Sequence, residues 1–272
     1  MNTKDLKAAL TTTMDAAHKA GSIMYRNFRK VKVINESTRH DIKLELDIRC
    51  QEAIEKRLKK DFPHFAILGE EGTTGNIQSE YRWVIDPIDG TVNFTYDIPH
   101  ACTSIALQKR ISDNQEVDDM NYTTLVGVIH DPFTDETWTA IKGQNARLNS
   151  KVISVSSRRK LSDSMVTLGF AKKQSNISLM MPVFERLAYK VKKIRMMGAA
   201  ALSMTYVASG RFDAYLESGV RLWDIAAGGL IIESAGGNFG YRPIDHDHSF
   251  RLCVSNGHIA KSIDKYFPLN EV

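Results

Sequence analysis

Apolar residues near the start of the chain recur at the spacing of an α-helix. Between residues 5 and 28 they stand mostly three or four positions apart, as Leu6, Ala9, Leu10, Ala16, Ala17, Ala20, Ile23, Met24 and Phe28. Such spacing makes one face of a helix apolar, so we predict a long packing helix without a chemical role. Residues 29–41 are polar and aperiodic, which predicts a mobile loop or a hairpin.

In the rest of the first half, short apolar runs alternate with polar segments. A helix is predicted from Asp47 to the Phe62-Pro63 pair, because the residue before a proline avoids the helical conformation. Strands are predicted at residues 65–68, 83–85, 103–108, 124–129 and 136–141, with a solvated hairpin loop at 110–121 and a turn at 143–149. Repeated strands joined by turns indicate an antiparallel sheet.

The pattern changes after about Lys151. Strands at residues 165–170, 191–196 and 212–217 alternate with helices at 179–189 and 199–209, and a further helix runs from Asp224 to Gly236. This alternation indicates helices packed against a sheet, the α/β arrangement. We therefore predict an α+β protein with an N-terminal half, residues 1–150, and an α/β C-terminal half, residues 151–272.

Residues 83–94, W-V-I-D-P-I-D-G-T-V-N-F, place two carboxylates where an apolar strand ends. Pro87 lacks an N–H, which predicts that ladder pairing stops after Asp86. Asp86 and Asp89 then converge on a turn, and converging carboxylates indicate hard cations. Gly90 allows close approach of a ligand, and the amides that follow suit a phosphate. The alternative is a plain loop, since Asp-Pro and Asp-Gly are common turn pairs.

The motif D-P-I-D-G-T-x-N-F resembles the core motif of the inositol monophosphatase family, which are Mg²⁺-dependent, lithium-sensitive phosphatases related to fructose-1,6-bisphosphatase. Two further motifs of that family follow the expected order: Gly69-Glu70-Glu71 upstream, and Trp223-Asp224 with Ala235-Gly236-Gly237 downstream. The resemblance spans about Asp41 to Gly257. It implies a layered α-β-α-β-α sandwich, with a mixed or antiparallel sheet in the N-terminal half.

The resemblance implies a site for two or three Mg²⁺ ions, which prefer hard oxygen ligands. The implied ligands are Glu70, Asp86, the Ile88 carbonyl, Asp89 and Asp224. The implied catalytic residues are Glu70 together with Thr91 and Asp47, which would orient or deprotonate the nucleophilic water. Each acid has an ordinary alternative: Asp47 and Asp224 as helix caps, and Glu70 as a solvent-facing member of an acidic pair.

The resemblance also implies the contacts of the substrate. Its phosphate would lie beside Asp89 at a helix start, on the amides of Gly90 and Thr91. Its alcohol would contact Glu217 and the turn formed by Gly198, Ala199 and Ala200. A carboxylate accepts hydrogen bonds from vicinal hydroxyls, so Glu217 suits a polyol. The alternative is that Glu217 is a structural partner for Arg211 or Arg221.

Two departures from the family pattern lie beside these residues. Leu44 stands where the family commonly has a threonine before the aspartate, and Glu45 adds a negative charge. The pair Arg221-Leu222 replaces the more usual residues before Trp-Asp. Asp47 and Asp224 themselves match the family at their positions.

The implied reaction is hydrolysis of myo-inositol monophosphate to inositol and phosphate. Phosphate monoesters are among the slowest substrates to hydrolyse without a catalyst, and metal ions both stabilise the leaving oxygen and acidify a water. Two alternatives remain. One is another small phosphate: fructose-1,6-bisphosphate, histidinol phosphate, NADP or 3′-phosphoadenosine phosphate. The other is a regulatory binding protein that contacts transcription machinery. The end of the motif favours the inositol phosphatase branch.

Composition and charge limit the remaining classes. The 272 residues are 43% hydrophobic and 25% charged, without an apolar run near membrane-helix length, and the first residues lack the apolar core of a signal peptide. A net charge of +4 is too small to indicate nucleic-acid binding. Three cysteines make no disulfide framework. We expect a cytoplasmic homodimeric enzyme for a small phosphorylated polyol, without a membrane or direct nucleic-acid partner.

Two polar segments are predicted to lie on the surface without a role in chemistry. Asp245-His246-Asp247-His248 has the residue types of a metal site, but alternating neighbours in a polar loop do not fix tetrahedral geometry. Arg158-Arg159-Lys160 is typical of a solvated turn.

Overall fold

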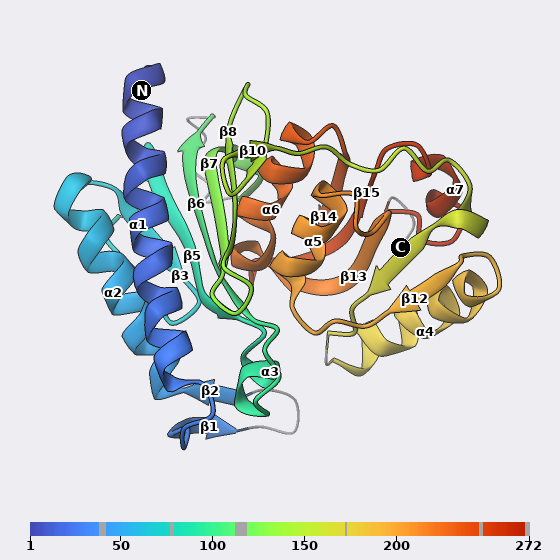
Figure 1. Cartoon of the computed structure of the whole chain (residues 1–272), viewed down its shortest axis with the longest axis horizontal. Coiled ribbons are helices and arrows are strands. Elements are labelled where there is room, and N and C mark those ends of the chain that lie inside the picture. Colours follow the sequence, from blue (N-terminus) through green and yellow to red (C-terminus); the bar gives the residue numbers. More distant parts are fainter. Residues whose placement is uncertain (38–41, 77–78, 112–118, 172, 245–246, 270–272) are drawn as a thin grey trace.

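Two large β-sheets and three layers of helices alternate through the described part of the molecule (Figure 1). The computed structural model describes residues 1–37, 42–76, 79–111, 119–171, 173–244 and 247–269. Helices α1 and α2 cover the outer face of the larger sheet, α5 and α6 lie between the sheets, and α4 and α7 cover the smaller sheet. This confirms the predicted α+β fold and its layered α-β-α-β-α order.

The larger sheet has eight strands in the order β10-β9-β8-β7-β6-β5-β3-β4. Its long strands are antiparallel neighbours: β5 (Tyr81–Asp89), β6 (Cys102–Arg110), β7 (Tyr122–Asp131) and β8 (Glu136–Ile141). β3 (Ala66–Gly69) is parallel to β5, so the carboxyl ends of both strands meet at one edge of the sheet. The short strands β4 (Gly72–Thr74), β9 (Arg147–Leu148) and β10 (Lys151–Val152) complete it.

Helices α1 (Thr3–Asn27) and α2 (Glu45–Asp61) pack on the sheet through small and aliphatic side chains. Ala16, Ala17 and Ala20 of α1 are completely buried. Alanine allows close approach to the strands beneath, and its burial explains why the apolar spacing predicted this helix correctly. Between the helices, β1 (Ile34–Ser37) and β2 (Ile42–Leu44) form an antiparallel pair, so the hairpin alternative is confirmed.

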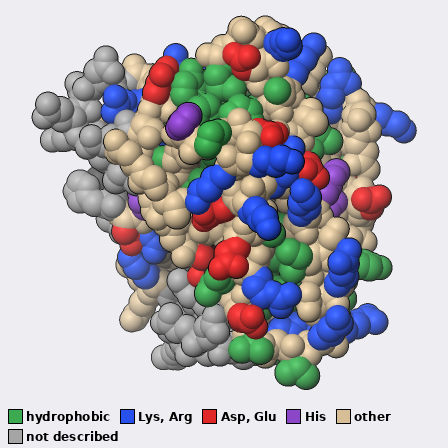
Figure 2. Space-filling view, turned by 90° about the vertical axis from the view of Figure 1, so that its left-hand side faces the viewer, with side chains coloured by type: hydrophobic (Ala, Val, Ile, Leu, Met, Phe, Trp, Pro, Cys, Tyr) green, Lys and Arg blue, Asp and Glu red, His purple; other side chains and the backbone are tan. Residues whose placement is uncertain are grey.

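The outer face of these two helices carries both signs of charge side by side (Figure 2). Arg57 forms ion pairs with Asp15 of α1 and Asp61 of α2, the latter at 2.8 Å. Exposed pairs of this kind contribute little to stability. Among the described residues of this face, the interspersed charge leaves no broad basic or acidic patch for a polyanion or polycation.

The smaller sheet has five strands in the order β12-β11-β13-β15-β14. Strands β11 (Met165–Leu168), β12 (Lys193–Arg195) and β13 (Ala214–Arg221) are parallel, whereas β15 (Ser249–Ser255) is antiparallel to β13 and to β14 (Asn238–Pro243). Helices α4 (Gln174–Ala188) and α7 (Ala260–Asp264) cover it. The sequence did not predict β14, β15 or α7, and α4 begins at Gln174 rather than at residue 179.

The central helices α5 (Ala200–Ala208) and α6 (Leu222–Ser234) are buried between the sheets on nearly all sides. Their apolar surface therefore runs all round rather than along one stripe. A glycine brings α6 close to the larger sheet: a Cβ on Gly127 of β7 would lie 2.8 Å from the carbonyl oxygen of Ala227. This close packing determines how near the first turn of α6 lies to β5 and β6.

Two segments predicted to lie on the surface contain side chains with specific partners. The Arg158 Nε donates to both carboxylate oxygens of the completely buried Asp213 at 2.8 Å, although the Arg158 side chain itself stays 39% exposed. His248 is half-buried and lies 2.6 Å from Asp119, so a plain surface reading is wrong for it. Asp247 pairs with Arg221 at 2.7 Å. Asp245 and His246 lie outside the described residues.

The two sheets use separate stretches of the chain, residues 66–152 and 165–255. Whether the halves 1–150 and 151–272 are independent domains stays a prediction. Among the helices in the described ranges, none is long and apolar enough to span a membrane.

Candidate active site

Strand β5 continues through both aspartates of the central motif. Its pairing with β6 shifts register between Asp86 and Asp89 and resumes at the Asp89–Cys102 pair. The predicted turn between the two aspartates is therefore wrong. Pairing is interrupted at Pro87 as predicted, but it resumes at Asp89 instead of ending there. The irregular pairing accommodates Pro87, which has no N–H to donate to β6. The Pro87 carbonyl accepts a hydrogen bond from Thr103 Oγ1 at 2.9 Å.

The chain turns at Gly90 instead, directly after β5. Gly90 has a φ of +89°, in the left-handed region that favours glycine. A Cβ there would lie 2.9 Å from the carbonyl oxygen of His100. Helix α3 (Thr91–Thr95) begins at the next residue, so the turn delivers the helix start to the same edge of the sheet as Asp86 and Asp89.

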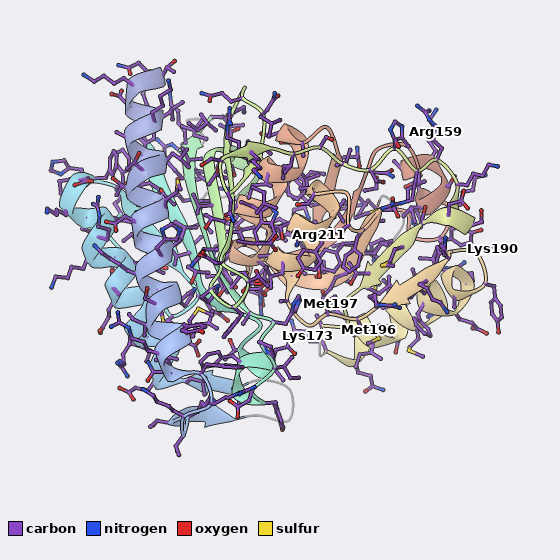
Figure 3. The ribbon with its side chains drawn as sticks, in the orientation of Figure 1. Arg159, Lys173, Lys190, Met196, Met197 and Arg211 are labelled. Atoms are coloured by element: carbon purple, nitrogen blue, oxygen red, sulfur yellow. The ribbon has the colours of Figure 1, made fainter. Side chains whose placement is uncertain are left out.

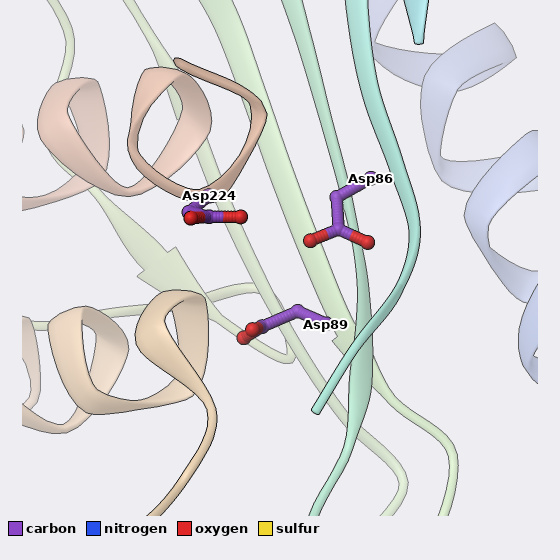
Figure 4. Close-up of side chains that lie close together, drawn as sticks. All are labelled: Asp86, Asp89 and Asp224. Atoms are coloured by element: carbon purple, nitrogen blue, oxygen red, sulfur yellow. The ribbon is translucent and has the colours of Figure 1, made fainter. Parts of the chain in front are cut away.

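Three carboxylates from two distant segments meet at this edge (Figure 4). Asp86 and Asp89 come from β5 and Asp224 from the first turn of α6, and one oxygen of each lies within 4.8 Å of the others. Glu70, directly after β3, lines the same cavity, as does Ile88. The structure thus brings all five predicted metal ligands to one cavity. Its donors are hard oxygens, the type that Mg²⁺ prefers.

The electrostatics of the cluster fit a divalent cation. Burial raises the pKa of Asp224 to about 8 and that of Asp89 to about 6. Burial, followed by the charges of neighbouring acids, raises the pKa values of Glu70 and Asp86 well above the ordinary range. Asp86 Oδ1 is buried without a hydrogen-bond partner among the described residues. Repelling carboxylates with an unsatisfied oxygen are stabilised by a cation between them.

Asp89 is oriented by the start of α5. The backbone N–H groups of Ala200 and Ala201 donate to its two oxygens at 3.1 and 2.8 Å, and the Cys102 thiol lies 3.6 Å away. Gly198, Ala199 and Ala200, which were predicted to contact the substrate alcohol, line the cavity. The amide of Ala200 donates a hydrogen bond to Asp89. The turn therefore orients a predicted metal ligand, and it also lines the cavity.

Asn93 is a site residue that the sequence reasoning missed. Its Nδ2 donates to the carbonyls of His100 and Met197 at 3.0 and 2.9 Å. It thereby ties α3 to the loop before α5. A Cβ on Gly198, whose φ is +74°, would lie 3.0 Å from this amide. The signal was present, since Asn93 is the asparagine of D-P-I-D-G-T-x-N-F.

Asp224 stands inside α6 rather than at its N-cap. The N-cap is Arg221, whose backbone N–H donates to Asp224 Oδ2 at 2.7 Å. The predicted cap is therefore wrong by three positions, although the carboxylate does satisfy a backbone group of the helix start. Ser104 Oγ of β6 donates to the Trp223 carbonyl at 3.2 Å, which fixes this turn against the larger sheet.

The two residues predicted to act on the nucleophilic water lie near the same edge. Asp47 is only 2% exposed and accepts a bond from the Leu44 N–H at 2.8 Å. Its charge helps to raise the pKa values of Glu70 and Asp86, which places it beside the cluster. Thr91 lines the cavity, and its hydroxyl donates to the Ile88 carbonyl at 2.8 Å.

The cavity has a volume of about 570 Å³ and a wall that is mostly apolar away from the carboxylates. Met196 and Met197, on the segment between β12 and α5 (Figure 3), form part of this wall with Phe170. Glu217 faces the cavity too, and it accepts a hydrogen bond from the Tyr215 hydroxyl. Burial raises the pKa of Glu217 to about 7.

The alternative role of Glu217, as a structural partner of a nearby arginine, is not what the structure shows. Arg211 is bonded to Glu136, and Arg221 is bonded to Asp247. Glu217 therefore remains available to a ligand of the cavity.

The stability of the metal-free protein is expected to fall as the pH rises from about 5 to 9. Burial raises the folded-state pKa values of Asp89 and Asp224 to about 6 and about 8, above the ordinary 3.8. Their contribution to stability is thus complete below about pH 4 and is lost as pH rises through these values. Thermal unfolding in EDTA across this range measures the loss, which Asp224→Asn should reduce.

Saturating Mg²⁺ is expected to remove this pH dependence above pH 7, because a cation compensates the ionised carboxylates. Asp15→Asn on α1 is the control and should keep the slope of the wild type. A metal-free protein whose melting temperature is unaffected by Asp224→Asn at pH 8 would contradict the expectation.

The layered fold and the acidic cluster together define a metal-dependent phosphatase. Comparison with known proteins agrees: the model of the inositol monophosphatase family matches residues 5–257. The chain belongs to the inositol monophosphatase family.

Relatives of this chain carry two kinds of name. It is 32% identical to inositol monophosphatase 1 of Solanum lycopersicum, with 98% of this chain and 97% of that protein covered. It is 33% identical to the inositol-1-monophosphatase of Rhizobium meliloti, with 94% of each covered. It is also 37% identical to the Nus factor SuhB of Xylella fastidiosa, with 85% of this chain and 81% of that protein covered.

Solved structures show the same fold. The inositol monophosphatase of Anabaena superimposes with a TM-score of 0.82 at 30% identity, covering 96% of each chain. The extragenic suppressor protein suhB of Bartonella henselae superimposes with a TM-score of 0.86 at 28% identity, covering 97% of this chain and all of that one.

Proposed function

We propose that this protein is a Mg²⁺-dependent phosphomonoesterase that hydrolyses myo-inositol monophosphate to inositol and phosphate. The observation that carries the proposal is the convergence of Asp86, Asp89 and Asp224 in one cavity with Glu70 and Glu217. The relatives named inositol monophosphatase in tomato and in R. meliloti support it. We further propose a cytoplasmic homodimer that is inhibited by Li⁺.

Each part of the cluster has a proposed task. Glu70, Asp86, Asp89, Asp224 and the Ile88 carbonyl would hold two or three Mg²⁺ ions. When bound, Mg²⁺ supplies charge neutralisation at the phosphoryl group and acidification of water. The amides of Gly90 and Thr91, at the start of α3, would bind phosphate oxygens. The bonds from Ala200 and Ala201 keep Asp89 in one orientation, so it enters the reaction already ordered.

The charges that line the cavity favour a substrate with a single phosphate. Among its described lining residues, Arg221 is the only cationic one, and its guanidinium is paired with Asp247 at 2.7 Å. A second phosphate group, as in fructose-1,6-bisphosphate, NADP or 3′-phosphoadenosine phosphate, would lack a free cationic partner there. The hydroxyls of a polyol could instead donate to Glu217.

A panel of phosphate monoesters assayed with Mg²⁺ tests the proposal. We expect the highest kcat/KM for myo-inositol monophosphate, and lower values for histidinol phosphate and for the three substrates with further phosphates. A preference for fructose-1,6-bisphosphate or 3′-phosphoadenosine phosphate would replace the proposed substrate. Absence of activity on every member of the panel would count against the phosphatase itself.

Glu217→Gln is expected to raise KM for inositol monophosphate about tenfold with a small change in kcat. Hydrogen bonds to a charged group contribute about 1.5–3 kcal/mol, and about 1.4 kcal/mol corresponds to tenfold. Glutamine keeps an oxygen that accepts the Tyr215 bond. Steady-state kinetics measure the change, with Glu136→Gln, at the Arg211 pair, as the control. An unchanged KM would remove the main support for a polyol.

A second candidate function is regulatory contact with transcription machinery. It is favoured by the name Nus factor SuhB, which relatives in Xylella fastidiosa, Pasteurella multocida and Pseudomonas aeruginosa share at 34–37% identity. Binding to purified RNA polymerase, measured beside the phosphatase assay, separates the two functions. Asp224→Asn should retain any such contact while losing hydrolysis.

A further inference from the structure

We propose that Arg82, Asp119 and His248 form a positioning network that holds Asp224 in place opposite Asp86 and so raises the affinity of the site for divalent cations. The inference rests on the metal cluster of the proposed function. None of the three residues lines the 570 Å³ cavity. They would therefore act through the backbone that carries the ligands, and not on the substrate.

The network begins on the strand that carries two of the ligands. Arg82 lies on β5 four residues before Asp86, so both side chains leave the same face of the strand, about 13 Å apart. Val84, between them on this face, packs in the core cluster that contains α6. Arg82 is 1% exposed, and its Nε donates to Gln108 Oε1 at 2.9 Å. Its burial and this hydrogen bond keep the Arg82 guanidinium in one position relative to β5.

Asp119 connects this guanidinium to the other sheet. It opens a short 3₁₀ turn, Asp119–Asn121, and its Oδ1 accepts a bond from Arg82 Nη2 at 3.0 Å. Its Oδ2 lies 2.6 Å from His248 Nδ1. Burial alone would raise the pKa of Asp119, but the His248 bond and the Arg82 charge lower it below the ordinary value. An ionised Asp119 thus bonds both neighbours at once.

His248 transmits this hold to the start of α6. Its carbonyl accepts a bond from the Leu222 N–H at 3.0 Å, and its ring lies 6.1 Å from the Trp223 ring. Leu222 is the first residue of α6, and Asp224 is two residues further on. His248 has a φ of +60°, which is uncommon for a residue other than glycine. The bonds at its ring and carbonyl hold this conformation in place.

The network therefore joins two parts of the metal site that come from different sheets. Asp86 belongs to the larger sheet, whereas Asp224 lies in the first turn of α6, which follows directly on β13 of the smaller one. Without a cation, ionised carboxylates within 4.8 Å repel one another and favour separation of the two parts. A bond from β5 to the first turn of α6 opposes that separation, so less binding energy is spent on closing the site.

Substitutions at His248 test the network, because they separate the effect of its backbone angle from the effect of its side-chain hydrogen bond. Glycine suits a φ of +60° but lacks the ring donor, whereas asparagine tolerates this angle and offers an amide donor near the position of Nδ1. Mn²⁺ binding, followed by electron paramagnetic resonance without substrate, reports directly on the site. We expect His248→Gly and Asp119→Asn to weaken Mn²⁺ binding about tenfold, and His248→Asn by less than about threefold.

The matched control is His18→Asn, which removes a histidine bonded to Thr137 at 3.1 Å on the α1 side of the larger sheet. It should bind Mn²⁺ as the wild type does. Equal Mn²⁺ affinity in His248→Gly and the wild type would overturn the network. An equal loss in His248→Gly and His248→Asn would overturn it too, because the hydrogen bond would then carry no part of the effect.

This experiment and the test of the proposed function can fail separately. Mn²⁺ binding needs no substrate, so a protein that binds Mn²⁺ with the expected pattern but hydrolyses nothing would contradict only the proposed reaction. A wild type that hydrolyses inositol monophosphate, with His248 variants of unchanged Mn²⁺ affinity, would contradict only the network.

Discussion

Asp224→Asn is expected to lower kcat/KM about a thousandfold while raising the melting temperature of the metal-free protein. Both effects arise from one charge, because the Asp224 carboxylate lies within 4.8 Å of Asp86 and Asp89. That charge attracts a cation, and it repels its neighbours when the cation is removed. Coordination supplies several kcal/mol of transition-state stabilisation, and about 4 kcal/mol corresponds to a thousandfold.

The substitution separates this charge from the structural role of Asp224. The carboxylate accepts the Arg221 N–H at 2.7 Å, and the oxygen of an asparagine can accept the same bond. The start of α6 should therefore persist. The charges of such a site serve function at the expense of stability. Removal of one of them is therefore expected to give a variant that is more stable but inactive.

Three measurements check the expectation: kcat/KM with Mg²⁺, Mg²⁺ binding by calorimetry, and thermal unfolding in EDTA. Asp15→Asn on α1, an exposed aspartate paired with Lys19 at 3.2 Å, is the control and should change each by little. EDTA should abolish the activity of the wild type. A less stable Asp224→Asn protein with unchanged Mg²⁺ affinity would show that Asp224 only caps its helix.

The sequence predicted best those elements whose burial pattern is local. The helices α1 and α2 were identified because one face of each carries apolar residues at helical spacing. Strand β15 was missed although Phe250, Leu252 and Val254 alternate with more polar residues, which is a usable strand signal. Strand β14 gives a weaker signal, because its residues are half-buried or exposed at the edge of the sheet.

The site shows where local reasoning ends. A Pro between two aspartates predicted a turn, but the register shift that keeps β5 paired depends on its partner β6, which no local pattern describes. Asp86 and Asp224 are 138 positions apart, so their meeting was predictable only through the resemblance to a family. The bond from Arg158 to Asp213 was not predicted either, because the two residues are 55 positions apart in the sequence.

Thr91→Ala and Asp47→Asn are each expected to lower kcat about 10²–10⁴-fold, the usual contribution of groups that orient a nucleophile or take its proton. Thr91 lines the cavity at the start of α3. Strand β2, which leads into the helix of Asp47, packs against α3. A threonine hydroxyl is a poor base, but it can take a proton from the attacking water if it passes its own to a carboxylate. Asp47 is the proposed carboxylate.

The structure refines what Thr91 must do. Its hydroxyl now donates to the Ile88 carbonyl at 2.8 Å, so it has to turn toward Asp47 when the nucleophilic water is in place. A hydroxyl rotor can make this change at little cost, and the Ile88 carbonyl has a second lone pair for other partners. We therefore expect Mg²⁺ binding by Thr91→Ala to stay within about threefold of the wild type, with the loss confined to kcat.

Two controls match these substitutions on the same helices. Thr95→Ala removes a hydroxyl that donates to the Thr91 carbonyl at 2.8 Å, and Glu45→Gln removes an exposed charge in the first turn of α2. Both should retain most of kcat. A large loss in Thr95→Ala would mean that the packing of α3, rather than the Thr91 hydroxyl, accounts for the effect.

The double variant decides whether the two residues act together. If Thr91 passes its proton to Asp47, loss of either breaks the same path, and Thr91→Ala/Asp47→Asn should be little slower than the slower single variant. Single-turnover rates, measured at saturating Mg²⁺ with the enzyme in excess over the substrate, isolate the chemical step from binding. Strictly additive losses would show independent action. Asp47, which accepts the Leu44 N–H at 2.8 Å, would then be explained by that bond to the start of α2 and by its charge beside Glu70 and Asp86.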